Sequence, residues 1–79
     1  MGLNDKEKQE FKKTVYDPYS EAWTIMKFLR DADITSQATW DEYMNKCNEF
    51  NSKFVSEIGE SIYRVLLDCG SEVSRIVKS

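Results

Sequence analysis

The side chains with catalytic potential in this 79-residue chain are carboxylates and two thiols, because the sequence contains no histidine. Nucleophilic catalysis needs a base beside a serine or cysteine, and the usual base is missing. Carboxylate pairs such as Asp41 and Glu42 fall in polar segments, without the apolar surroundings that raise the pKa of a carboxyl group. The sequence therefore predicts a protein that is not an enzyme and has neither a small-molecule substrate nor a cofactor.

One polar segment has the spacing of a calcium-binding loop. Between residues 31 and 42, oxygen-bearing side chains occupy positions 1, 3, 5, 7, 9 and 12 of a twelve-residue frame, which is the ligand frame of an EF-hand. These side chains are Asp31, Asp33, Thr35, Gln37, Thr39 and Glu42. The segment departs from that motif at Ser36, which replaces the glycine of position 6, and no second loop is present to pair with it. We expect a helix connection without a metal, and a metal-responsive helical module is the alternative interpretation.

The two cysteines, Cys47 and Cys69, show no Cys-x-x-Cys pattern and have no histidine to complete a zinc site. We expect both to be small buried hydrophobic side chains in a reducing compartment. A disulfide between them requires the chain to fold back, since one straight helix would hold them about 33 Å apart. The N-terminal residues lack the apolar core of a signal peptide, and no apolar run approaches the length of a membrane span. A cytoplasmic location is therefore expected.

The net charge of −3, from 14 acidic and 11 basic residues, is unevenly distributed. Residues 1–16 carry a net +1, residues 17–42 a net −4, and residues 43–79 are balanced. No basic stripe is present, and the acidic middle segment would be repelled by phosphates and by anionic lipids. Direct nucleic-acid binding and membrane binding are not expected.

Apolar residues recur every three or four positions from Trp40 to Ile76, which predicts a helix over residues 40–78. Thr39 and Glu42 have capping-box spacing at its start, and three Glu-to-base pairs along it are spaced i, i+4: Glu42–Lys46, Glu49–Lys53 and Glu60–Arg64. Gly59 is the uncertain point, because glycine inside a helix costs about 1 kcal/mol relative to alanine. We favour one helix with a local bend there, and a break near Gly59 that gives two helices is the alternative.

Two shorter helices are predicted upstream. The first covers residues 5–16, with Asn4 or Asp5 as its N-cap, and the second covers residues 18–31, with Asp17 as N-cap and Pro18 at its first position. The fold class that follows is all-α: one domain of residues 1–79 forming a compact three-helix bundle, or four helices if the chain breaks near Gly59.

The second helix has more apolar surface than one neighbour can cover. Its apolar residues span about 220° of the helical wheel, against about 100° or more for an ordinary surface helix. Large apolar patches on small proteins usually mark partner sites. We therefore predict a protein-binding module that acts through apolar helix faces, as a homodimer or as an accessory or inhibitor of a larger protein, of the kind that phages and mobile elements encode. The predicted interface residues are Tyr19, Trp23, Met26, Val55, Tyr63 and Leu67.

Overall fold

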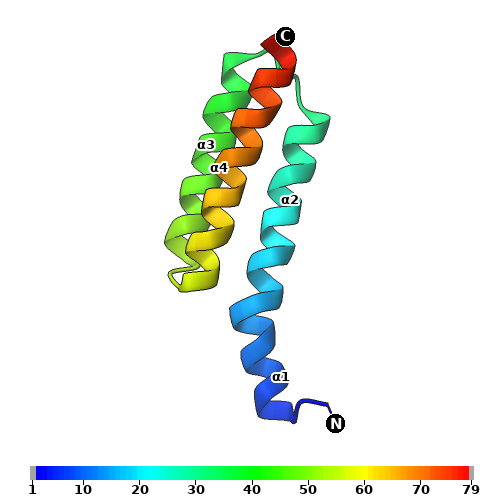
Figure 1. The fold of residues 1–79 in the computed structure, drawn as a ribbon, viewed down its shortest axis with the longest axis vertical. Coiled ribbons are helices and arrows are strands. Elements are labelled where there is room, and N and C mark those ends of the chain that lie inside the picture. Colours follow the sequence, from blue (N-terminus) through cyan, green and yellow to red (C-terminus); the bar gives the residue numbers. More distant parts are fainter. Residues whose placement is uncertain (1, 79) are drawn as a thin grey trace.

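The structure, a computed structural model, describes residues 2–78 and contains three helical rods (Figure 1). The first rod is continuous and consists of α1 (Asp5–Phe11), the π-helical turn η1 (Lys12–Tyr16) and α2 (Asp17–Asp31). It is followed by α3 (Gln37–Lys53) and α4 (Glu57–Lys78), and the described residues contain no strand. The predicted fold class, an all-α three-helix bundle, is confirmed, although three of the predicted helix boundaries are wrong.

The predicted start of a new helix at Pro18 is wrong, because the chain passes through Asp17 with helical dihedral angles (φ −63°, ψ −43°). A proline inside an α-helix lacks a donor, and its ring clashes with the carbonyl group four residues earlier. Here the turn just before Pro18 widens into a π-helix, in which the Asp17 N–H donates to the Lys12 carbonyl oxygen, five residues back. The wider turn accommodates the proline within one continuous helix, and its ring is buried.

The predicted single helix over residues 40–78 is also wrong, because the chain turns back between Lys53 and Glu57; the alternative prediction, a break near Gly59 that gives two helices, is the one observed. Ser56 begins the new helix, where its Oγ accepts a hydrogen bond from the Gly59 N–H at 3.0 Å. Gly59 lies inside α4 with a negative φ, so it does not serve as a left-handed helix end. Its role is close approach, because a Cβ at this position would lie 1.9 Å from the Phe54 carbonyl oxygen.

The predicted capping box at the start of α3 does not form, because α3 begins two residues before Thr39. Ser36 occupies the N-cap position with extended dihedral angles, and Thr39 lies in the first turn with only 9% of its surface exposed. The capping box at the start of α1 does form. There the Glu7 N–H donates to Asn4 Oδ1 at 2.8 Å, and the Asn4 N–H donates to Glu7 Oε1 at 2.9 Å.

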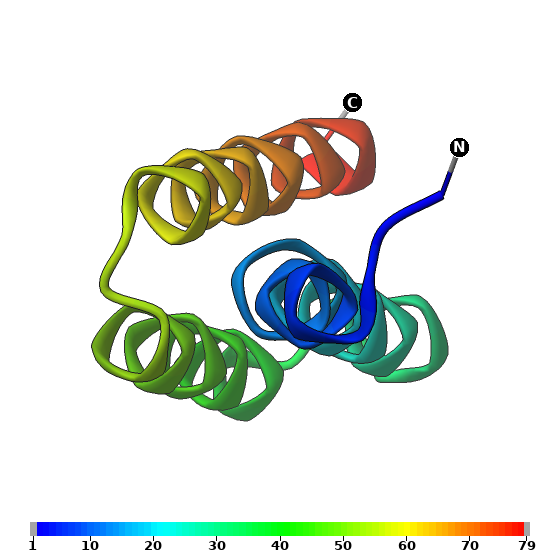
Figure 2. The same ribbon diagram turned by 90° about the horizontal axis from the view of Figure 1, so that it is seen from below.

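The core lies where the three helices meet, at the centre of the triangular arrangement seen along the helices in Figure 2. Tyr43 joins α3 to α4, since its hydroxyl donates to the Leu66 carbonyl oxygen at 2.5 Å and its ring occupies the space left by Gly70. All three helices contribute buried apolar side chains: Ala22, Ile25, Leu29, Tyr43, Cys47, Phe50, Ile62 and Leu66. This small core stabilises the bundle along α2, α3 and α4 only.

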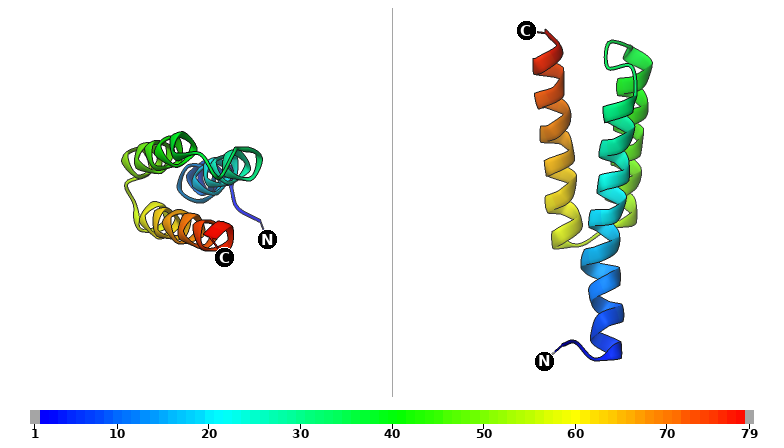
Figure 3. Two further views of the ribbon diagram at one scale, coloured as in Figure 1. Left: turned by 90° about the horizontal axis from the view of Figure 1, so that it is seen from above. Right: turned by 90° about the vertical axis from the view of Figure 1, so that its right-hand side faces the viewer.

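The first rod is longer than the bundle, and its N-terminal part extends beyond the α3–α4 turn (Figure 3, right). No residue of α1 is buried, and among the described elements α1 contacts only the π turn that follows it. The resulting shape is elongated, with principal extents of 48 × 24 × 17 Å. The fold therefore presents a solvent-exposed helical arm next to a packed three-helix body.

Candidate protein-interaction surface

The calcium-like frame of residues 31–42 does not converge on a central point in this structure. The Asp31 carboxylate accepts hydrogen bonds from Arg30 at 2.8 and 2.9 Å, and this contact lowers the pKa of Asp31. The Asp33 carboxylate accepts hydrogen bonds from the Thr35 hydroxyl at 2.6 Å and the Thr35 N–H at 3.0 Å, which lowers the pKa of Asp33. Each carboxylate thus accepts hydrogen bonds from a residue one or two positions away in the chain.

The remaining positions of that frame belong to the first turns of α3. Gln37 donates to the Asp41 carboxylate at 3.1 Å, and Thr39 is directed into the protein interior. Within residues 2–78, no group of three or more His, Cys, Asp or Glu side chains is placed to hold a metal ion. The observed role of the segment is to connect α2 to α3, with Asp33 organising the turn.

The two cysteines lie on different helices, and both are free thiols. Cys47 is fully buried on α3, and this burial raises the pKa of its thiol, so the reactive thiolate is disfavoured. Cys69 on α4 is half-buried. Burial also raises the pKa of the neighbouring Tyr43 hydroxyl. Cys47 and Tyr43 are part of the core, and the burial of Cys47 is not the environment of an activated nucleophile.

The six predicted interface residues fall in three different places. Tyr19 and Trp23 lie exposed on α2, at 60% and 61% of their full surface, and Met26, one turn further along α2, is half-buried and packs against the core. Val55 is exposed in the α3–α4 turn. Tyr63 and Leu67 on α4 are half-buried against the core, and the Tyr63 hydroxyl donates to Asn48 Oδ1 at 3.1 Å. The structure therefore places three of the six on α2, of which Tyr19 and Trp23 are exposed on its outer face and Met26 lies at the edge of the core.

The opposite flank of α2 is occupied by contacts with α3. Lys53 reaches across to the Glu21 carboxylate at 2.8 Å, and the Lys46 ammonium lies 4.9 Å from the centre of the Phe28 ring. The sequence predicted that both lysines pair along their own helix, and of the three predicted pairs a contact is seen for Glu60–Arg64, at 3.3 Å. On a helical wheel, Glu21 and Phe28 lie roughly opposite Tyr19. These contacts fix the orientation of α2 and leave its aromatic flank towards solvent.

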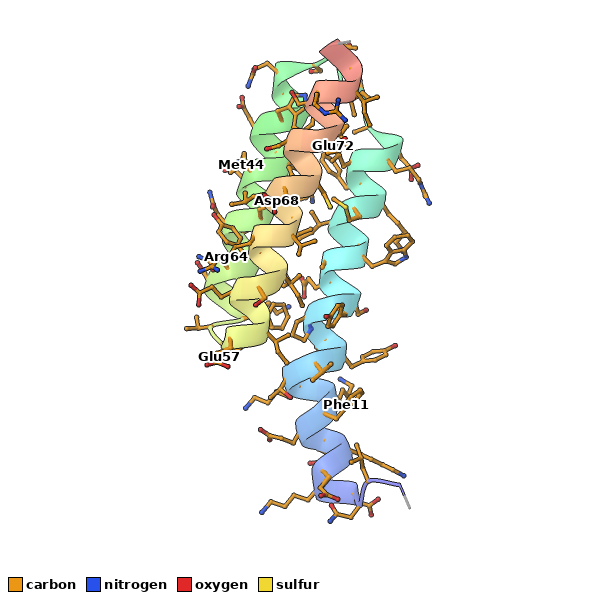
Figure 4. All side chains as sticks on the ribbon, in the orientation of Figure 1. Phe11, Met44, Glu57, Arg64, Asp68 and Glu72 are labelled. Carbon is orange, nitrogen blue, oxygen red and sulfur yellow. The ribbon has the colours of Figure 1, made fainter. Side chains whose placement is uncertain are left out.

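Two further aromatic residues, which the sequence analysis placed on a separate helix, extend this flank. Phe11 and Tyr16 are 48% and 58% exposed, and they belong to the same continuous rod as Tyr19 and Trp23. Figure 4 shows Phe11 on the arm, below the α3–α4 turn. We call these four residues the aromatic stripe.

The π turn is what aligns the aromatic stripe. Phe11 and Tyr16 are five residues apart. In a regular α-helix, residues four apart lie on nearly the same face, and a fifth residue adds a further rotation of about 100°. A π turn takes up one additional residue, so Phe11 returns to the face of Tyr19. An ion pair between the Lys12 ammonium and the Asp17 carboxylate, at 3.3 Å, spans the same turn. The feature of the sequence that indicates the π turn is Pro18, which follows this turn directly.

Comparison of the chain with models of protein families, with curated proteins and with solved structures finds no match in any of the three. Over residues 2–78, no helix is both long enough and apolar enough to cross a membrane.

Proposed function

We propose that this protein is a non-enzymatic protein-binding module and that its binding surface is the aromatic stripe of the first rod. The observation that carries the proposal is the row of four half-exposed aromatic rings along one helix, on both the bundle and the arm. Each ring leaves on the order of 100 Å² exposed, so the stripe reaches the size of the largest apolar patches on typical monomers, which are often functional.

The residue types in the stripe also favour a protein partner. Tyrosine and tryptophan are enriched among the side chains that carry most of the binding energy at protein interfaces, because they bury a large area at a low entropic cost. The partner is either another copy of the chain or a larger protein for which this module acts as an accessory or inhibitor. The two free thiols support a reducing, cytoplasmic location. The alternative of a metal-responsive module gains no support from Asp31 and Asp33, which are held by Arg30 and Thr35.

A site-specific photocrosslink tests this proposal. A benzophenone amino acid at position 19 replaces one exposed aromatic ring by another, and the same group at Met44, which is 41% exposed on the outer face of α3, provides a control of similar exposure. We expect irradiation of cells that make the protein to give protein adducts from position 19 and few or none from position 44. Absence of adducts from position 19, including adducts to the protein itself, would contradict the proposed function.

A further inference from the structure

We infer that the occupant of the aromatic stripe is the same stripe of a second copy of this chain, packed antiparallel about a two-fold axis that passes between Tyr16 and Tyr19. This inference rests on the proposed function and identifies the partner for the same surface. The supporting observations are the repeat along the first rod, the exposed arm, the distribution of charge and the area available.

The first observation is a repeat typical of a helix-pairing seam. Coiled-coil helices meet along positions that alternate in steps of three and four. The first rod has such a series, with a single step of five at the π turn, which absorbs the additional residue. The series is Asn4, Lys8, Phe11, Tyr16, Tyr19, Trp23, Met26 and Arg30. Its four middle positions are the residues of the aromatic stripe and its ends are polar, so the seam has a defined length and a centre between Tyr16 and Tyr19.

The second observation is the position of that centre, where the arm meets the bundle. Phe11 lies on the arm, while Tyr19 and Trp23 lie on α2 within the bundle. A two-fold axis between Tyr16 and Tyr19 places Phe11 of each copy against Trp23 of the partner subunit, and Tyr16 against Tyr19 of the partner subunit. Each arm then lies along the other copy's α2. Within its own chain α1 packs against no other helix and contacts only the π turn that follows it, so this contact supplies the packing that the arm lacks.

Charge favours the antiparallel direction over the parallel one. Residues 1–16 carry four lysines against three acids, a net +1, while residues 17–31 carry three acids against two bases, a net −1. An antiparallel pair places each positive arm beside the negative α2 of the other copy, whereas a parallel pair places like charges side by side.

The exposed area indicates a weak dimer. Eight half-exposed rings in a symmetric pair contribute on the order of 800 Å², and the flanking side chains bring the total near the roughly 1,000–1,200 Å² at the lower end of specific interfaces. Interfaces of that size are typical of complexes that dissociate in the micromolar range or above, because association also costs translational and rotational freedom. Self-association should therefore depend visibly on protein concentration.

Sedimentation equilibrium on the full chain, from roughly 1 µM to 1 mM, tests the inference in the range where a weak interface dissociates. We expect a monomer–dimer equilibrium. Tyr19→Glu should raise the dissociation constant by about tenfold or more, because two carboxylates are then buried near the two-fold axis. Met44→Ala, which lies outside the stripe, should leave the constant unchanged. Circular dichroism of both variants at the lowest concentration checks that the monomer remains folded.

A spin label at position 6 determines the direction of the pair. The substitution Lys6→Cys places the label on the arm, in a Cys69→Ser background that leaves only the fully buried Cys47. At 1.5 Å per residue, the antiparallel arrangement separates the two labels by about 35 Å, whereas a parallel pair brings them within about 20 Å. A label separation in the shorter range would overturn the antiparallel arrangement.

A monomer at every concentration would overturn the whole inference, as would a dimer that Tyr19→Glu leaves intact. Neither result contradicts the proposed function, because photocrosslinks from position 19 to a different protein would still support it. Failure of the crosslink itself is the separate result that contradicts the proposed function.

Discussion

Trp23 and Leu29 show how one helix serves two purposes. Both are large apolar residues of α2, yet Leu29 is 3% exposed in the core, whereas Trp23 is 61% exposed. The sequence marks both as apolar anchors and does not separate them, because the apolar arc of α2 is wider than the face it buries. The contacts of Glu21 and Phe28 with α3 show which side of α2 faces the bundle.

We therefore expect Leu29→Ala and Trp23→Ala to differ sharply in a urea titration at a concentration low enough to keep the chain monomeric. Removing a buried leucine side chain should lower the free energy of unfolding by about 2–5 kcal/mol, through lost burial and the cavity left behind. The loss from Trp23→Ala should stay below about 1 kcal/mol, because the ring is largely hydrated in the folded monomer. Equal losses would mean that Trp23 is part of the core.

Tyr43 predicts how stability changes in alkaline solution. Burial, followed by the nearby thiols of Cys47 and Cys69, raises the pKa of its hydroxyl above the usual value of about 10, while in the unfolded chain the hydroxyl titrates near that value. Above pH 10 the folded state therefore holds one more proton than the unfolded state. The stabilisation from this group is complete below pH 10, and it is lost at about 1.4 kcal/mol per pH unit as the pH rises towards the folded pKa.

The check is a series of urea titrations between pH 8 and pH 11 on Tyr43→Phe and, as a control, Tyr63→Phe. The first variant should lose the alkaline slope assigned to Tyr43, together with about 0.5–1.5 kcal/mol from the hydrogen bond to Leu66. The control retains Tyr43 and should retain that slope. An unchanged slope in Tyr43→Phe would assign the alkaline loss to another group.

At the scale of the helices, some features with a local cause were predicted well, whereas the capping box at Thr39 and the features with a tertiary cause were not. The Asn4 cap and the end of α2 at Asp31 depend on neighbouring residues, and both were read correctly. The continuity of the chain through Pro18 depends on a π turn, and the reversal before Glu57 depends on packing of α4 against α3. Three helices were expected and three are seen. The predicted break at Pro18 is absent, and the helix predicted as continuous over residues 40–78 is broken before Glu57.

The start of α4 had a recognisable signal in the sequence. Ser56 precedes Glu57 and Glu60, the pattern of a capping serine followed by acids in the first turn. Because Ser56 Oγ accepts from the Gly59 N–H, Ser56→Ala should lower the free energy of unfolding by about 0.5–2 kcal/mol. Ser52→Ala, on the exposed side of α3, is the matched control and should have little effect in the same thermal melt. A melting temperature that falls equally in both variants would contradict the capping role.

At the scale of the whole molecule, only part of the candidate site could be predicted from the sequence. Tyr19, Trp23 and Met26 followed from their spacing on one helix, because a regular α-helix places them on one face. The addition of Phe11 and Tyr16 to this face did not follow from the sequence. Residues five apart do not share a face of a regular α-helix, and only the π turn brings them together. Val55, Tyr63 and Leu67 were grouped with them because they lie off the main apolar stripe of the helix predicted over residues 40–78, and the fold places these three in a different part of the molecule.

The division into a packed body and an exposed arm predicts two levels of amide protection in hydrogen exchange. In dilute solution, amides of Asp5–Phe11 should exchange with little protection, because α1 buries no side chain and opens without disturbing the core. Amides around Tyr43 to Phe50 should exchange only through global unfolding, since that part of α3 supplies the most deeply buried side chains. When the concentration is raised until the chain self-associates, protection should increase along α1 and not on the outer face of α3, because only the arm gains a partner. Strong protection of α1 at every concentration would show instead that the arm is stable by itself, and the antiparallel pair would lose its energetic basis.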